Sequence, residues 1–344
     1  MDNRSPLLSQ PQSPEWMNDF RARIGEEHDL KKRSNGIGLA LLAVYLLMNL
    51  LPLFFIGIAD SCGFNLPSSI GVGFGGMHPA LYYLVTGNAY LWSTVLPFAL
   101  YLRLSKTPAA EVMPFRRAGF GRCAALVAAG LAVCVCANYA ANLLTQNLAL
   151  IGVYPYLPDS PYSGDLLSLL LFVATSALIP AFVEEFIFRG VIMGSLRRFG
   201  KGFAVFASAL IFGLFHGNLV QIPFAFLVGL ALGFVAIQTQ SLWPAVWVHF
   251  LNNFYSCAMT IVARNAPEEL YTLVFLCVTL CMLLAGFIGF ACLACKDKQL
   301  FSLSGEGSAL SFRVKTGYLF ATPGMILVMV FILLQTLLLV QVRL

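Results

Sequence analysis

Long apolar runs dominate the chain and leave few polar positions between them. A helix that crosses a bilayer needs about 20 mostly apolar residues. Nine stretches come close to this length, although the second and the fifth are short. They cover residues 37–59, 88–104, 119–145, 166–188, 202–216, 219–238, 242–263, 270–294 and 318–341. The pattern predicts an all-α fold, a polytopic transmembrane helical bundle with about eight or nine spans.

The composition agrees with this prediction. Hydrophobic residues make up 59% of the 344 positions and charged residues only 11%, whereas a soluble domain has about half and a quarter respectively. We therefore expect an integral membrane protein whose immediate partner is the lipid bilayer.

Basic residues indicate the orientation, because cytoplasmic loops collect Lys and Arg. With nine spans and a cytoplasmic N-terminus, 19 of the 21 Lys and Arg residues fall on the cytoplasmic side, and only Arg264 and Arg343 fall outside. This asymmetry also accounts for the net charge of +5. We predict a cytoplasmic N-terminus and no nucleic-acid partner.

Ionisable side chains within the apolar runs are scarce, and each is a functional candidate because its burial in hydrocarbon is costly. They are Glu184, Glu185, His216 and His249, all between residues 184 and 249. On a helix, Arg189 shares a face with Glu185 and can form an ion pair with it, while Glu184 is rotated by about 100°. The simpler alternative to a functional site is that these charged residues lie at the end of a helix and face cytoplasmic water.

The depth of these groups constrains the helices. If the fourth run ended at Phe188, Glu184 would lie near the surface, whereas His216 would lie about 21 Å deep at 1.5 Å per residue. We therefore expect the helix to continue past Arg189 and to bury it.

Two further pairs share helix faces, Phe212 with His216 and His249 with Asn253, each four residues apart. Imidazole and amide donors that point the same way could stabilise an oxyanion. They could equally form hydrogen bonds between helices.

Together, EExxxR at residues 184–189, FxxxH at 212–216 and HxxxN at 249–253 resemble the type II CAAX prenyl protease and bacteriocin-processing family, which is also called lysostaphin resistance protein A-like. The resemblance covers about residues 165–263. It implies an intramembrane endopeptidase that acts on a membrane-associated peptide or protein. In this family resemblance, Glu184 and His216 would together activate water. The oxyanion would be stabilised by His249 and Asn253. Supporting roles would fall to Glu185, Arg189 and Phe212.

The resemblance leaves the cofactor open. Glu184, His216 and His249 could supply the His₂Glu set of a catalytic zinc site, but the compact HExxH motif is absent. We favour chemistry without a cofactor and keep zinc as the alternative. A non-enzymatic immunity or scaffold protein with the peptidase fold is a second functional hypothesis, and a proton-coupled transporter that uses the buried carboxylates is a third.

The domain organisation follows from these assignments. Residues 1–36 are expected to form a polar cytoplasmic tail with at most a short surface helix, and residues 37–164 the N-terminal spans and loops. Residues 165–263 would be the catalytic membrane core and 264–344 the C-terminal spans. The lack of organellar targeting signals favours a bacterial plasma membrane, and no sequence feature specifies an oligomeric state.

Overall fold

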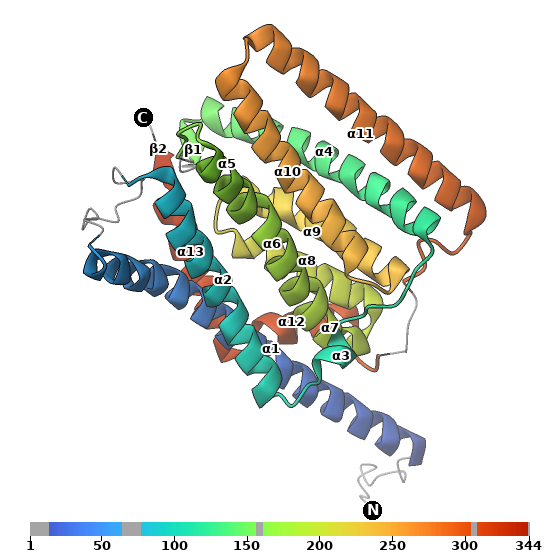
Figure 1. The fold of residues 1–344 in the computed structure, drawn as a ribbon. Helices are drawn as coiled ribbons and strands as arrows, with labels where there is room; N and C mark the ends of the chain where they lie inside the picture. Colours follow the sequence, from blue (N-terminus) through green and yellow to red (C-terminus); the bar gives the residue numbers. More distant parts are fainter. Residues whose placement is uncertain (1–13, 64–76, 156–160, 304–307, 343–344) are drawn as a thin grey trace, which may run out of the picture.

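The computed structural model describes residues 14–63, 77–155, 161–303 and 308–342 as a bundle of helices (Figure 1). The predicted all-α class is confirmed, with the addition of one short antiparallel ribbon in which β1 pairs with β2. The elements are α1 Pro14–Ser61, α2 Pro79–Leu104, α3 Ala109–Val112, α4 Phe120–Leu150, β1 Val153–Pro155, α5 Leu166–Val173, η1 Ala174–Leu178, α6 Ile179–Glu184, η2 Glu185–Ile192, α7 Met193–Leu196, η3 Arg197–Phe199, α8 Lys201–Phe215, α9 Gln221–Thr239, α10 Trp243–Asn265, α11 Glu268–Lys296, α12 Phe312–Phe320, α13 Pro323–Leu338 and β2 Val340–Val342.

All nine predicted apolar stretches lie largely on helices, but the number of spans is not confirmed. Within the described residues, five helical segments are long and apolar enough to cross a membrane. A sixth results if α12 and α13, which are bent by 74° at their junction, count as one span. The helix α8 has 15 residues and is therefore about 22 Å long, less than the apolar thickness of a bilayer.

One continuous helical segment, residues 166–199, runs from α5 to η3. The expected continuation past Arg189 is confirmed, since this segment ends only at Phe199. Two of its parts, η1 and η2, are π-helical, with wider turns than an α-helix. Such turns shift the register of backbone hydrogen bonds and are frequent at functional sites. Ser208 of α8 donates to the carbonyl oxygen of Phe188 in η2, at 2.7 Å.

The N-terminal region differs from the expected tail. Residues 14–36 form the first part of α1, a helix of 48 residues. Glu26 accepts a hydrogen bond from the backbone N–H of Ala309, and Asp29 pairs with Arg198 at the end of the long segment. These contacts with distant parts of the chain hold polar residues in a helix, which the local sequence pattern did not indicate.

Small residues allow the helices to approach closely. Gly38 of α1 lies against the backbone of Gly324 in α13, and Gly286 and Gly289 of α11 lie against α4. Close packing of this kind is a main source of helix association in lipid. The helices α8 and α9 form a hairpin, and Gly217, with φ of +55°, ends α8 directly after His216. A left-handed glycine is a common helix terminator.

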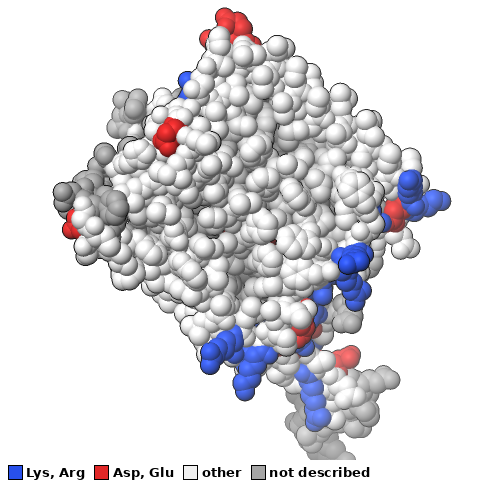
Figure 2. Space-filling view, viewed as in Figure 1, with Lys and Arg blue, Asp and Glu red and all other residues white. Residues whose placement is uncertain are grey.

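Charge is distributed unevenly over the bundle, as Figure 2 shows for one face. Lysines and arginines gather along one end, near the N-terminal part of α1 and the adjoining loops, while acidic side chains lie both among them and at the opposite end. We call the first region the basic end. It includes Arg103, Arg197 and Lys201 at the ends of their helices.

Alanine at Gly38 should destabilise the fold. Its Cβ would lie 2.3 Å from backbone atoms of Gly324 and Met325, so α1 and α13 would have to separate. We expect a loss of about 1–3 kcal/mol in the free energy of unfolding, seen as a lower melting temperature of the purified protein. Gly57→Ala, on the same helix with no atom within 4 Å, is the control and should be neutral or stabilising. Equal melting temperatures for the two variants would contradict the close approach.

Candidate active site

Arg189 and Glu185 form an ion pair that is completely buried. Arg189 Nη1 donates to Glu185 Oε1 at 2.8 Å, and both side chains are 0% exposed. Arg189 Nη2 donates to the carbonyl oxygen of Gly229 in α9 at 3.3 Å, and the guanidinium group lies 4.2 Å from the centre of the Phe212 ring. The predicted pair is therefore present in the interior and not in cytoplasmic water.

His249 reaches the same carboxylate from α10. Its Nδ1 lies 2.8 Å from Glu185 Oε1, and its Nε2 lies 3.8 Å from Glu184 Oε2. Because a carboxylate only accepts, Nδ1 carries a hydrogen and donates it. The bond to Glu185 thus fixes the imidazole so that Nε2 faces Glu184.

Glu184 is buried at the end of α6, next to the start of the π-helical segment. Tyr90 of α2 donates a short hydrogen bond from its hydroxyl to Glu184 Oε1. The second oxygen, Oε2, is buried and accepts no hydrogen bond from the described residues. One oxygen is therefore held in place, while the other has no hydrogen-bond donor among the described residues.

The sequence did not indicate Tyr90. Tyrosines are common in membrane helices near the interface, and Tyr90 belongs to none of the three motifs. Its partner is 94 positions away. The sequence holds one weak signal. Tyr90 lies 13 residues before Arg103, and Glu184 lies 13 residues before Arg197, so the two side chains are equally far along their helices from these arginines.

His216 lies at the end of α8, where its Nδ1 is 2.9 Å from the carbonyl oxygen of Phe212. The carbonyl can only accept, so Nδ1 carries the hydrogen, and Nε2 of the neutral ring has a lone pair. The side chain is close enough to Glu184 and His249 to interact electrostatically with both. Tyr45 of α1 fixes this end of α8 by donating to the carbonyl oxygen of Phe215 at 2.6 Å.

Phe212 is the packing centre of the site. Its ring meets that of His216 edge-on at 4.9 Å between centroids and that of His249 at 5.9 Å. With Arg189 over its face, this one side chain contacts residues from all three motifs. It therefore packs between residues of all three motifs.

The asparagines lie one turn beyond His249 on α10. Asn252 is buried, and its Nδ2 donates to Asn253 Oδ1 at 3.2 Å, while Asn253 is half-buried. That bond occupies the amide oxygen of Asn253, so its NH₂ group is the part available to another acceptor. The role of Asn253 in an oxyanion site remains a prediction.

The three side chains proposed as zinc ligands are not arranged as a metal site in the structure. Among the described residues, no group of three His, Cys, Asp or Glu side chains is placed to hold a metal ion, and this includes Glu184, His216 and His249. His249 Nδ1 and His216 Nδ1 each carry a hydrogen that is bonded to another protein group. The metal dependence of the chain stays a prediction.

The segment that contains these residues matches a known protein family. Residues 166–255 match the model of the family described as Type II CAAX prenyl endopeptidase Rce1-like. The predicted resemblance to the CAAX protease family is confirmed. The matched segment runs from α5 into α10 and contains all three motifs. At the level of the family, it indicates a membrane protease.

The chain is also similar to "Putative membrane peptidase YdiL" of Bacillus subtilis (strain 168). The two are 28% identical over 101 residues, which is 29% of this chain and 41% of the relative. The chain thus matches about two fifths of that protein's length. No solved structure matches this chain.

Removing the charge of Arg189 should destabilise the protein. Arg189→Ala would leave the Glu185 carboxylate without its cation, at a cost of about 3–5 kcal/mol. We expect a lower yield and a lower melting temperature. The double variant Arg189→Met/Glu185→Met removes both charges and should lose less stability than Arg189→Ala alone. A single variant as stable as the wild type would show that the pair is hydrated.

Proposed function

We propose that the chain is an intramembrane endopeptidase in which Glu184 activates the water that attacks a peptide bond. The observation that supports this most directly is the state of the Glu184 carboxylate. One oxygen accepts from Tyr90. The other, like Oε2 of Glu185, is buried without a hydrogen bond from the described residues, and it lies 3.8 Å from Nε2 of His249. A buried carboxylate oxygen without a hydrogen bond is costly, and a water bound between Glu184 and His216 would satisfy it.

In this proposal the peptide bond is hydrolysed through a tetrahedral intermediate. Glu184 Oε2 takes one proton from the water, the water oxygen bonds to the carbonyl carbon, and the C=O π electrons move to the oxygen. His216 Nε2 accepts the second hydrogen bond of the water and orients it. When the tetrahedral intermediate collapses, the C–N bond breaks and Glu184 returns its proton to the leaving amine. General acid–base catalysis of this kind contributes about 10²–10⁴-fold.

His249 and Asn253 would stabilise the oxyanion. To donate from Nε2 while Nδ1–H is bonded to Glu185, His249 must be in its imidazolium form. In that form the charges of His249 and Arg189 balance those of Glu184 and Glu185. Preorganised donors in a dry site favour the transition state strongly.

Tyr90 is a positioning residue in this scheme. Its bond to Oε1 prevents the Glu184 carboxylate from rotating and leaves Oε2 to meet the water. The substrate is a membrane-associated peptide or protein, and the protein would reside in a bacterial plasma membrane with its basic end, including the N-terminal part of α1, in the cytoplasm.

The decisive experiment is a cleavage assay on purified protein with Glu184→Gln. The glutamine keeps the shape of the side chain and still accepts from Tyr90, so the melting temperature should change little. Activity should fall by about 10²–10⁴-fold because the base is lost. Full activity in this variant would exclude Glu184 as the base. Activity lost on chelation and restored by zinc would favour the metallopeptidase alternative.

The oxyanion assignment predicts a particular kinetic effect at Asn253. Asn253→Ala should reduce kcat by about 10²–10³-fold with little change in KM, because the donor acts on the transition state. Asn252→Ala, which removes only the group that holds the Asn253 oxygen, should reduce kcat less. A larger effect of Asn252→Ala, or an effect of Asn253→Ala on KM alone, would reassign Asn253 to binding or packing.

A further inference from the structure

Two helices from opposite ends of the chain, α1 and α13, pack against each other (Figure 1). Gly38 of α1 lies against the backbone of Gly324 in α13, and the backbone N–H of Gly324 donates to Asn35 Oδ1 at 2.8 Å. Both helices lie outside residues 166–255, the segment that matches the family. We call α1 and α13 the terminal helix pair.

The terminal helix pair contacts the end of α8 that carries His216. Tyr45 of α1 is 3% exposed, and its hydroxyl donates to the carbonyl oxygen of Phe215 at 2.6 Å. The Tyr45 ring lies 5.5 Å from the Phe215 ring and 5.2 Å from the Phe331 ring of α13, measured between centroids. Because Phe215 directly precedes His216, the position of its backbone sets that of the imidazole.

The last turn of α8 needs such partners. The final carbonyl groups of a helix have no acceptor role within it, so a donor must come from elsewhere, and Tyr45 supplies one to Phe215. The next residue after His216 is the left-handed Gly217, and Gln335 of α13 lies over it. A Cβ at Gly217 would be 3.3 Å from the carboxamide of Gln335. Both members of the terminal helix pair therefore contact this turn.

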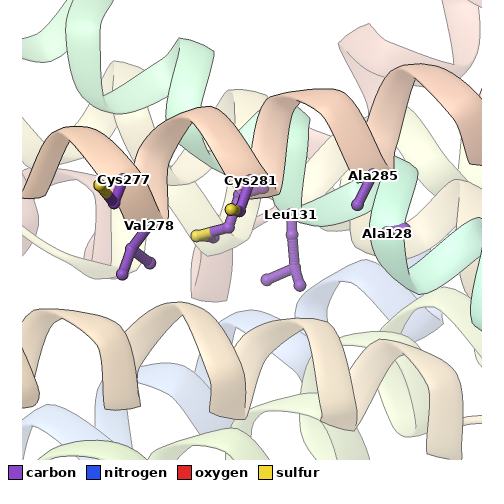
Figure 3. Close-up of a pocket in the computed structure, with 7 residues that line it drawn as sticks. Ala128, Leu131, Cys277, Val278, Cys281 and Ala285 are labelled. Carbon is purple, nitrogen blue, oxygen red and sulfur yellow. The ribbon is translucent and has the colours of Figure 1, made fainter. Parts of the chain in front are cut away.

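The larger cavities of the bundle are lined by other residues. The cavity of about 350 Å³ in Figure 3 lies between α4 and α11, with Cys277 and Cys281 among its lining side chains. Two others have volumes of about 330 Å³ and 280 Å³. None of these three cavities is lined by Tyr45, Phe215 or His216. The last turn of α8 thus borders on packed side chains and not on any of these spaces.

We propose that Tyr45 is a positioning residue for catalysis, because its hydrogen bond to Phe215 sets the position of His216 relative to Glu184. The inference rests on the proposed peptidase function. In that function the imidazole orients the attacking water, and a displacement of about 1 Å can cost about a hundredfold in rate. The terminal helix pair would then complete a site whose reacting groups all belong to the family segment.

The first test compares Tyr45→Phe with a matched control. Tyr83 of α2 is 4% exposed, donates to the carbonyl oxygen of Pro161 at 2.7 Å and lies 5.6 Å from the Phe172 ring. At equal amounts of folded protein, Tyr45→Phe should lower kcat by about 10–100-fold with little change in KM. Tyr83→Phe should stay close to the wild type. Equal kcat losses in the two variants, or none in Tyr45→Phe, would overturn the proposal.

A double-mutant cycle identifies the group through which Tyr45 acts. Tyr45 is also close enough to Tyr90 to interact with it electrostatically, so an effect through Tyr90 and Glu184 is the alternative. In a His216→Ala background, Tyr45→Phe should cost less than about twofold in single-turnover rate, because the group that it positions is gone. A loss as large as in the wild-type background would assign Tyr45 to the Tyr90 side and overturn the proposal.

Hydrogen exchange tests the same contact without any substrate. The backbone N–H groups of His216 and Gly217 bond within the last turn of α8. In Tyr45→Phe they should exchange at least about tenfold faster than in the wild type, because this turn opens more often, whereas Tyr83→Phe should leave them unchanged. Wild-type exchange in Tyr45→Phe would contradict the proposal. If the wild type cleaves nothing while exchange rises as expected, the peptidase function fails but the hold of Tyr45 on α8 stands.

Discussion

The Glu185 carboxylate lies fully inside the bundle, and a single oxygen of it is bonded to both Arg189 and His249. An unpaired ion at this depth would cost several kcal/mol. The two partners come from the same helix and from α10, so the carboxylate connects helices that are far apart in the sequence. The orientation of His249, and through it the position of Nε2 beside Glu184, depends on this interaction.

The irregular parts of the helical segment 166–199 contribute to the same cluster. Glu184 and Glu185 stand at the junction between α6 and the π-helical η2, and both carboxylates are buried. One contacts Tyr90 and the other contacts His249 and Arg189. The shortness of α8 and the left-handed Gly217 bring His216 to the same level of the bundle. Irregular backbone is tolerated at such a depth when it faces protein or water and not lipid.

Much of the fold was predictable, because apolar length and helical periodicity are local properties of the chain. The nine apolar stretches and the burial of Arg189 followed from them. The N-terminal part of α1 did not, since residues 14–36 are polar and their helix is held by contacts with residues near 309 and 198. Tyr90 was missed for a similar reason, as its contact with Glu184 arises only when α2 packs on α6.

The sequence by itself determined that the chain is a helical membrane protein and that two glutamates, two histidines and an arginine would lie near one another. It could do so because ionisable groups in apolar runs are excluded from lipid and must find one another. Only the tertiary structure decided which atoms meet: that His249 Nδ1 bonds to Glu185 while its Nε2 lies 3.8 Å from Glu184, and that Tyr90 holds the other oxygen of Glu184. These contacts depend on how each helix is rotated and shifted against its neighbours. A change of a fraction of a turn would bring other side chains together, and the spacing of residues within one helix does not reveal it.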